Sequence, residues 1–205
     1  MSTRGFVGFV ADDTEKIAYN HSDSYPRGLG LEVLEWLRST VSEAKDPAEA
    51  ITQVRELVRA LRVVDLDSTP TGEDIERLKE FASQRVPRGE LIEWYMLLHA
   101  TEGNLGEILR AGVIEDAASF PIDSLSAQWG YLVDLDAEVF EVYRGSQKKP
   151  HERGRFAARA PERGDHWPVA LVTSWPLTAL PSPADFLTTL QRRYPASVGA
   201  HPVTS

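Results

Sequence analysis

The segment Phe6-Val7-Gly8-Phe9-Val10-Ala11 is apolar at every position. A strand that is apolar on both faces is covered on both sides, so this segment predicts a central strand of a sheet. The polar residues 12–15 supply a turn, and Lys16-Ile17-Ala18-Tyr19-Asn20 follows as a second strand. Together they predict a β-hairpin close to the amino terminus.

A second hairpin is predicted in the other half of the chain. Residues 129–135 and 139–143 are rich in aromatic and β-branched side chains and flank the polar residues 136–138. Such a pattern is a strong hairpin signal, and residues 169–175 add a fifth strand. Because both hairpins are apolar on both faces, we expect them to be neighbours in one covered sheet.

Between the hairpins, apolar residues recur at helical spacing. The pattern predicts four to five helices in an insertion at about 31–112, one of them over 91–100. Asp46 is expected to cap one helix, and Ser182 to begin a last helix that runs to about Arg193. Strands grouped apart from helices predict an α+β fold with a mainly antiparallel sheet. We expect a single domain over residues 1–194 and a flexible tail at 195–205.

Composition narrows the classes of function. The chain has 205 residues, 31 acidic against 22 basic side chains, a net charge of -9 and no cysteine. A net negative charge argues against nucleic acid and anionic membranes as partners. Absence of cysteine excludes disulfides, thiolate metal sites and cysteine nucleophiles. No apolar run reaches the length of a membrane helix, and we expect a cytoplasmic protein.

The candidate site is the sequence Tyr-Asn-His-Ser-Asp-Ser-Tyr-Pro-Arg-Gly-Leu-Gly at residues 19–30. It places an amide, an imidazole, a carboxylate and hydroxyls between a strand and a helix, where rigid elements can aim them at one point. We therefore expect Asn20, His21 and Asp23 to share a polar pocket with a residue of the second hairpin. A purely structural role stays open, because Asp-Ser-Tyr-Pro is also favourable turn chemistry.

Roles can be assigned within this site. His21 and Asp23 suit a general base and the carboxylate that orients it. The residues predicted to bind a ligand are Arg4, Ser24, Tyr25 and Asp134. A divalent cation held by His21, Asp23 and a carboxylate at Asp134 or Asp136 is an alternative, although we assign no metal and no cofactor. His99 and the aromatic residues Trp36, Trp94, Tyr95, Trp129, Tyr131 and Trp175 are expected to pack in the core.

Two resemblances bear on this site. Thr3-Arg4-Gly5, the motif at 19–30 and the later sequence Trp-Gly-Tyr-Leu-Val-Asp-Leu-Asp at 129–136 resemble a family of uncharacterised bacterial and phage proteins. The resemblance implies a shared fold and a shared site, but no reaction.

The amino terminus also resembles that of amino-terminal nucleophile hydrolases of the cholylglycine type. That resemblance implies Ser2 as nucleophile once Met1 is removed, with its own α-amine as base. Asn20 and Asp23 correspond to the asparagine and aspartate of those enzymes. Here the stretch between them is one residue longer, the arginine is absent, and serine stands where those enzymes use cysteine.

A basic segment follows the second hairpin. Residues 145–165 are rich in Gly, Pro and charged side chains, so we predict a mobile loop whose charges stay in solvent. The cationic side chains at and beside this loop are Arg144, Lys148, Lys149, Arg153, Arg155, Arg159 and Arg163.

Two classes of function remain open. The first is a small cofactor-independent enzyme, a hydrolase acting on a small molecule or peptide at the end of the first hairpin. The second is a phage-related recognition protein that holds a protein partner through the same motif and the basic loop.

Overall fold

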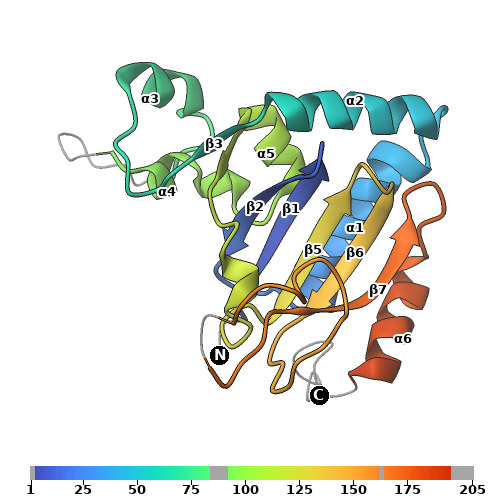
Figure 1. Ribbon diagram of the computed structural model, residues 1–205. Coiled ribbons are helices and arrows are strands. Elements are labelled where there is room, and N and C mark those ends of the chain that lie inside the picture. Colours follow the sequence, from blue (N-terminus) through green and yellow to red (C-terminus); the bar gives the residue numbers. More distant parts are fainter. Residues whose placement is uncertain (1–2, 84–91, 162–163, 195–205) are drawn as a thin grey trace, which may run out of the picture.

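The computed structural model describes residues 3–83, 92–161 and 164–194, which form an α+β fold around a five-stranded sheet (Figure 1). The strand order is β2-β1-β5-β6-β7, and only the β1–β5 pair is parallel. The two hairpins predicted from sequence are therefore neighbours in a mainly antiparallel sheet. The strands span β1 Gly5–Ala11, β2 Thr14–Asn20, β5 Trp129–Asp134, β6 Val139–Arg144 and β7 Ala170–Pro176.

The helices lie between β2 and β5 and after β7, as predicted. They are α1 Leu31–Leu37, α2 Pro47–Ala60, α3 Gly72–Leu78, α4 Trp94–Leu97, α5 Leu105–Ala111 and α6 Pro183–Arg193. π-Helical turns at Pro26–Gly30 and Arg38–Ser42 extend α1 at both ends. Asp46 caps α2 by accepting hydrogen bonds from the Ala48 and Glu49 N–H groups, both at 3.1 Å. Among the described residues, no helix has the length and apolar character needed to cross a membrane.

The helix predicted over residues 91–100 is shorter in its described part. α4 ends at Leu97, and a 3₁₀ turn follows at His99–Thr101. The Thr101 hydroxyl donates to the Leu98 carbonyl at 2.7 Å, a local bond that competes with continuation of the helix. Leu91 lies outside the described residues.

A small parallel sheet inside the insertion was not predicted. It pairs β3 Arg62–Val64 with β4 Val113–Glu115, each too short to show an alternating pattern. β4 lies beside the edge strand β2, and the Ala117 N–H donates to the Ile17 carbonyl of that strand at 2.9 Å. This arrangement brings Glu115, the last residue of β4, against β2.

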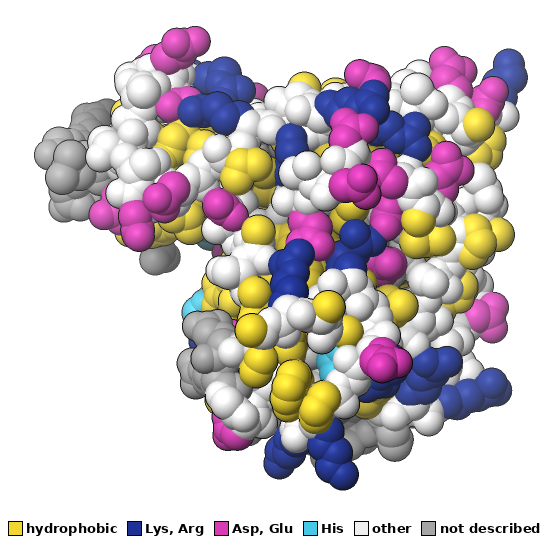
Figure 2. Space-filling model, viewed as in Figure 1, with side chains coloured by type: hydrophobic (Ala, Val, Ile, Leu, Met, Phe, Trp, Pro, Cys, Tyr) yellow, Lys and Arg dark blue, Asp and Glu magenta, His cyan; other side chains and the backbone are white. Residues whose placement is uncertain are grey.

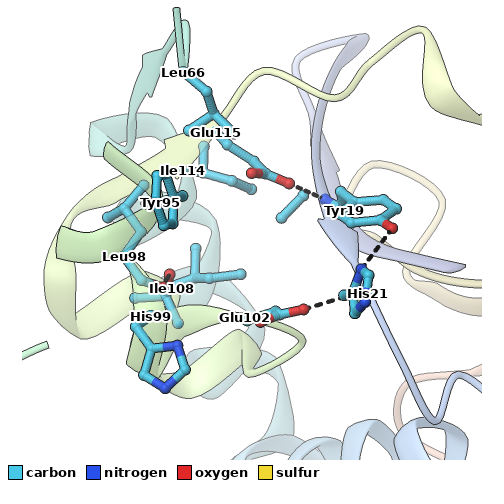
Figure 3. A pocket seen from close by; sticks show the side chains of 12 residues that line it. Tyr19, His21, Leu66, Tyr95, Leu98, His99, Glu102, Ile108, Ile114 and Glu115 are labelled. Atoms are coloured by element: carbon cyan, nitrogen blue, oxygen red, sulfur yellow. Dashed lines mark hydrogen bonds between the residues drawn. The ribbon is translucent and has the colours of Figure 1, made fainter. Parts of the chain in front are cut away.

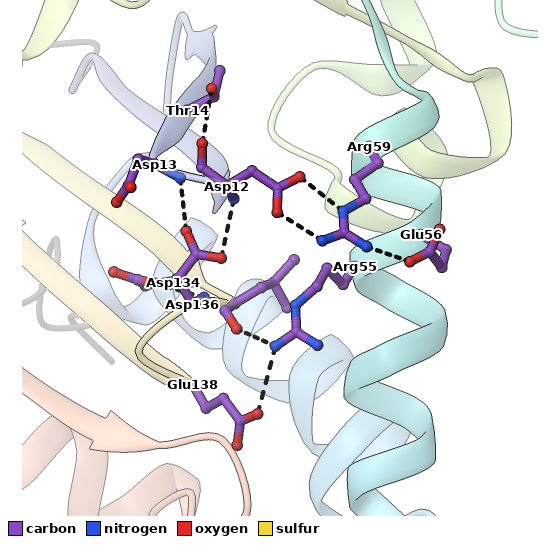
Figure 4. Close-up of polar contacts among 10 residues, drawn as sticks. Asp12, Asp13, Thr14, Arg55, Glu56, Arg59, Asp134, Asp136 and Glu138 are labelled. Carbon is purple, nitrogen blue, oxygen red and sulfur yellow. Dashed lines mark hydrogen bonds and ion pairs between the residues drawn. The ribbon is translucent and has the colours of Figure 1, made fainter.

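The turns of the two hairpins are joined to each other and to α2 (Figure 4). Asp12 and Asp13 adopt positive φ angles of 52° and 56°, as a two-residue hairpin turn requires. The Asp136 carboxylate accepts hydrogen bonds from both their N–H groups, at 3.0 and 2.9 Å. Arg59 of α2 holds the Asp12 carboxylate with two hydrogen bonds, at 2.8 and 2.7 Å. These polar contacts fix the end of the sheet at which both hairpin turns lie.

The sheet is covered on both faces. On one face, α1, α2, α5 and α6 pack on the inward side chains of the strands, including the fully buried Tyr131 and Phe140. On the other face, Phe6 and Tyr143 lie beneath the segment after β6, whose Phe156 is fully buried.

The charges of the basic loop do not all remain in solvent, contrary to our expectation. Arg155 pairs with Asp134 and with Glu141, the latter at 3.1 Å, and Arg159 pairs with Glu15 at 2.6 Å. The buried Phe156 between them supplies the apolar anchor that makes these pairings possible. The mobility of the loop stays a prediction, and residues 162–163 lie outside the described part.

Candidate functional site

A cavity of about 330 Å³ lies at the open edge of β2, between that strand and the α4, α5 and β4 part of the insertion (Figure 3). This volume is at the lower end of the range for small-molecule sites. Polar groups from the end of β2 and two glutamates face an apolar wall across it. The side chains that define its chemistry are Tyr19, His21, Glu102, Glu115, Leu66 and Tyr95.

The two glutamates bind the exposed edge of the sheet. The Tyr19 N–H donates to Glu115 Oε1, and the His21 N–H donates to Glu102 Oε1 at 2.8 Å. N–H groups on an edge strand need partners, and side chains from elsewhere supply them here. The hydrogen bonds also fix where both carboxylates sit in the cavity.

Glu115 has an unusual protonation equilibrium. Burial raises its pKa to about 7, the hydrogen bond from the Tyr19 backbone opposes the rise, and the charge of Glu102 adds to it. A carboxyl group with a pKa near neutral can both accept and donate a proton under ordinary conditions. Among the described residues that line the cavity, Glu115 is therefore the strongest candidate for proton transfer.

Tyr19 and His21 form a second polar cluster at the end of β2. The Tyr19 hydroxyl and His21 Nδ1 are 3.2 Å apart, and the Tyr19 ring packs edge-on against Phe120, with 4.9 Å between ring centroids. Burial raises the pKa of the Tyr19 phenol, while the charge of Arg4 and a hydrogen bond from it oppose the rise. Arg4 and His21, two residues predicted from the sequence, thus meet at Tyr19.

The opposite wall is apolar and opens to solvent at its rim. Leu98, Ile108 and Ile114 are buried there, whereas Leu66 is 39% exposed and Tyr95 is 58% exposed. Tyr95 was expected in the core, and that expectation is wrong. His99 was expected there too, but it is exposed on the 3₁₀ turn at the cavity. Both lie where the chain leaves α4 and turns, so their outward positions follow from the short helix.

Asn20 and Ser24 lie beneath the motif and bind each other. The Asn20 side-chain amide donates to Ser24 Oγ at 2.7 Å and to the Ser22 carbonyl, and both residues are buried. The Ser24 backbone is held as well, since its N–H donates to the Thr3 carbonyl and its carbonyl accepts from the Tyr131 hydroxyl, both at 3.0 Å. These contacts close the turn between β2 and the helical segment.

Asp23 and Tyr25 shape the same turn through their backbones. Asp23 is exposed with a φ of 58°, and its carbonyl accepts from the Leu29 N–H at 3.1 Å. The Tyr25 carbonyl accepts from the Gly28 and Gly30 N–H groups at 3.0 and 3.2 Å. Of the three residues expected to share a pocket, the cavity is lined by His21 but not by Asn20 or Asp23.

Asp134 lies far from this motif. In the sheet register Asp134 pairs with Val10, whereas Asn20 pairs with Gly5 at the other end of β1. The Asp134 carboxylate accepts from the Asp136 and Ala137 N–H groups at 2.9 and 2.8 Å, and it pairs with Arg155. Asp134 therefore does not face His21 across a common pocket.

Ser2 lies outside the described residues, so its role as nucleophile stays a prediction. Within the described ranges, no three His, Asp or Glu side chains gather closely enough to hold a metal ion. The motif at 19–30 thus contributes Tyr19 and His21 to the cavity and Asn20, Asp23, Ser24 and Tyr25 to the turn behind it.

The two glutamates of the cavity were not predicted from the sequence. Glu102 and Glu115 are 81 and 96 positions away from the backbone groups that they bind. The residues beside an isolated glutamate in the sequence do not indicate which distant backbone group it binds. No protein-family model, curated protein or solved structure matches this chain.

Proposed function

We propose that this protein is a small cofactor-independent hydrolase whose active site is the cavity at the end of β2. The observation that carries the proposal is Glu115, a partly buried carboxyl with a pKa of about 7 inside a ligand-sized cavity. Strongly shifted pKa values gather at catalytic sites, because acid–base catalysis at neutral pH needs groups that titrate there.

The proposed chemistry is general acid–base hydrolysis. Ionised Glu115 takes a proton from a water molecule as that water attacks the electrophilic carbon of the substrate. The protonated carboxyl then donates to the leaving group as its bond to that carbon breaks, which restores the carboxylate. His21, at the end of β2, supplies a donor for the charge that develops on the substrate.

The motif residues outside the cavity have supporting roles in this proposal. Asn20 and Ser24 hold the turn that sets the position of His21, and Asp23 provides its bend. The resemblances to the bacterial and phage family and to amino-terminal nucleophile hydrolases, together with a cytoplasmic location, stay predictions. A nucleophilic Ser2 would be an alternative mechanism to the water attack.

Glu115→Gln is expected to slow hydrolysis strongly while keeping the acceptor for the Tyr19 N–H. A panel of chromogenic esters, anilides and glycosides identifies the substrate, and the variant is compared with wild type on whichever compound is turned over. General acid–base groups contribute about 10²–10⁴-fold, so a loss of that size is expected in kcat. The wild-type profile should show a limb near pH 7.

Glu35→Gln, an exposed substitution on α1 away from this cavity, is the matched control and should keep wild-type turnover. Asp23→Asn tests whether the catalytic centre is the cavity or the turn. A loss of turnover as large as that of Glu115→Gln would favour the turn. Equal turnover by wild type and Glu115→Gln on every compound would contradict the proposal.

A recognition protein is the second candidate. Its supporting observation is that Arg155 and Phe156 anchor the basic loop while Lys148, Lys149 and Arg153 stay exposed. Figure 2 shows acidic side chains interspersed with basic ones on the face displayed, so a partner there would meet mixed charges. Loss of partner binding on reversing the charge of Lys148 and Lys149, with no effect of Glu115→Gln, would favour this candidate.

A further inference from the structure

The charged side chains that line the cavity are acidic. Two carboxylates, Glu102 and Glu115, line it, and no lysine or arginine is among its described lining residues. Each carboxylate uses Oε1 for a backbone N–H of the β2 edge. Across the part of the chain that the structure describes, the Oε2 atoms of these two residues accept no hydrogen bond. Two acceptor atoms are thus available to a ligand that donates.

The spacing of the carboxylates suits one small cationic group. Tyr19 and His21 are two residues apart in extended chain, so their N–H groups are separated by about 7 Å. The carboxylates bound to them lie on either side of a gap, as the close-up shows (Figure 3). A cation placed in that gap has a negative group on each side.

The wall opposite the carboxylates suits an apolar body. Leu98, Ile108 and Ile114 form its buried part, and Tyr95 and Leu66 lie at the rim. Side chains that are 58% and 39% exposed at a cavity mouth lose contact with water when a ligand covers them.

We propose that the cavity binds a small organic ammonium ion, its charged head between Glu102 and Glu115 and its apolar body against the opposite wall. Because it takes this cavity as the substrate site, the proposal rests on the proposed function and names the substrate class. An anion of the same shape would meet two carboxylates and is excluded by charge.

Binding of an ammonium ion should depend on pH. Burial keeps Glu115 partly protonated near pH 7, and a cation beside it favours the ionised form. The other titratable groups that face the gap are Tyr19 and His21 from the end of β2, His99 and Glu102 from the 3₁₀ turn region, and Tyr95 from α4. Affinity for the cation should therefore rise from pH 6 to pH 8, as Glu115 loses its proton.

Three compounds with one skeleton test the proposal by calorimetry at pH 8. They are 3-phenylpropylamine, which is cationic, 3-phenylpropan-1-ol, which is neutral, and 3-phenylpropanoate, which is anionic. The amine should bind about tenfold more tightly than the alcohol, since charge-assisted hydrogen bonds are the stronger ones. The anion should not bind. Amide chemical shifts should place the bound amine beside Tyr19, Glu102 and Glu115.

Variants identify the groups responsible. Glu115→Gln and Glu102→Gln keep the acceptors for the strand N–H groups, and each should weaken amine binding several-fold while leaving the alcohol unchanged. Glu35→Gln on α1 is the control and should bind the amine like wild type. Equal affinity for amine and alcohol, no binding of the amine, or chemical-shift changes that map elsewhere would overturn the proposal.

Failure of the ammonium-binding proposal can be distinguished from failure of the hydrolase proposal. If the amine binds as expected but no ester, anilide or glycoside is hydrolysed, the ligand class stands and the hydrolase proposal fails. If hydrolysis depends on Glu115 but the amine does not bind, the hydrolase stands and the ammonium ligand is wrong.

Discussion

Replacing Arg155 by leucine is expected to lower the free energy of unfolding by about 3–5 kcal/mol, which corresponds to roughly 6–20 °C in Tm for a chain of this size. Arg155 is 21% exposed and pairs with Asp134 and Glu141, whose side chains are 8% and 12% exposed. The substitution leaves two buried carboxylates without their cation. Thermal unfolding at pH 7 measures the loss.

Arg110→Leu is the matched control for this substitution. Arg110 also pairs with two carboxylates, Glu80 and Glu107, but it is 55% exposed. Exposed ion pairs contribute about 0–1 kcal/mol, so the control should unfold within a few degrees of wild type. If both variants lost the same small amount, the Arg155 network would have no special role in holding the loop on the sheet.

Replacing Gly130 by alanine is expected to destabilise the protein by about 3 kcal/mol, near the upper end for overpacking a core. Gly130 pairs with Phe6 across the parallel β1–β5 junction. A Cβ atom at this position would lie 2.0 Å from Phe6 Cζ and within 2.5 Å of both Cε atoms. The Phe6 ring is fully buried against Phe156 and Tyr143, so it cannot move aside without disturbing them.

Gly72→Ala serves as the comparison in the same unfolding experiment. A Cβ atom on Gly72, the first residue of α3, would meet nothing within 4 Å. Restricting the unfolded chain there should be neutral or stabilise by about 0.4–1 kcal/mol. An unchanged Tm for Gly130→Ala would show that the two hairpins do not pack at this junction as described.

Local sequence patterns predicted the parts of the fold that local physics determines. The apolar segment 6–11 could only be stable as a covered strand, and β1 is buried at every position. Asp46 and Ser182 mark the starts of α2 and α6 because their side-chain oxygens accept from the first N–H groups of those helices. The sequence pattern also indicated that the hairpins are neighbours, though not that their contact is the parallel β1–β5 pair.

Local sequence patterns could not predict contacts between segments that are distant in the sequence. Arg155 lies in a segment with no apolar periodicity, and nothing near it in sequence indicates Asp134 and Glu141 as partners. β3 and β4 are three residues long and depend on each other for pairing. Their pairing is what brings Glu115 to β2, so the candidate site could not be complete without it.

The motif at 19–30 was the correct neighbourhood but only part of the site. Its density of hydrogen-bonding groups is largely explained by the turn that Asn20 and Ser24 close. Of its members only Tyr19 and His21 line the cavity, and the chemistry there depends on glutamates supplied by the insertion.

The protonation of Glu115 is the most direct test of the proposed active site. Carbon-13 NMR can follow the side-chain carboxyl groups from pH 3 to 9, with the Glu115 signal assigned by its absence in Glu115→Gln. Burial in the cavity predicts a midpoint of about 7. A midpoint near 4.5, the ordinary value for glutamate, would contradict the account, because the carboxyl would then be a solvated surface group.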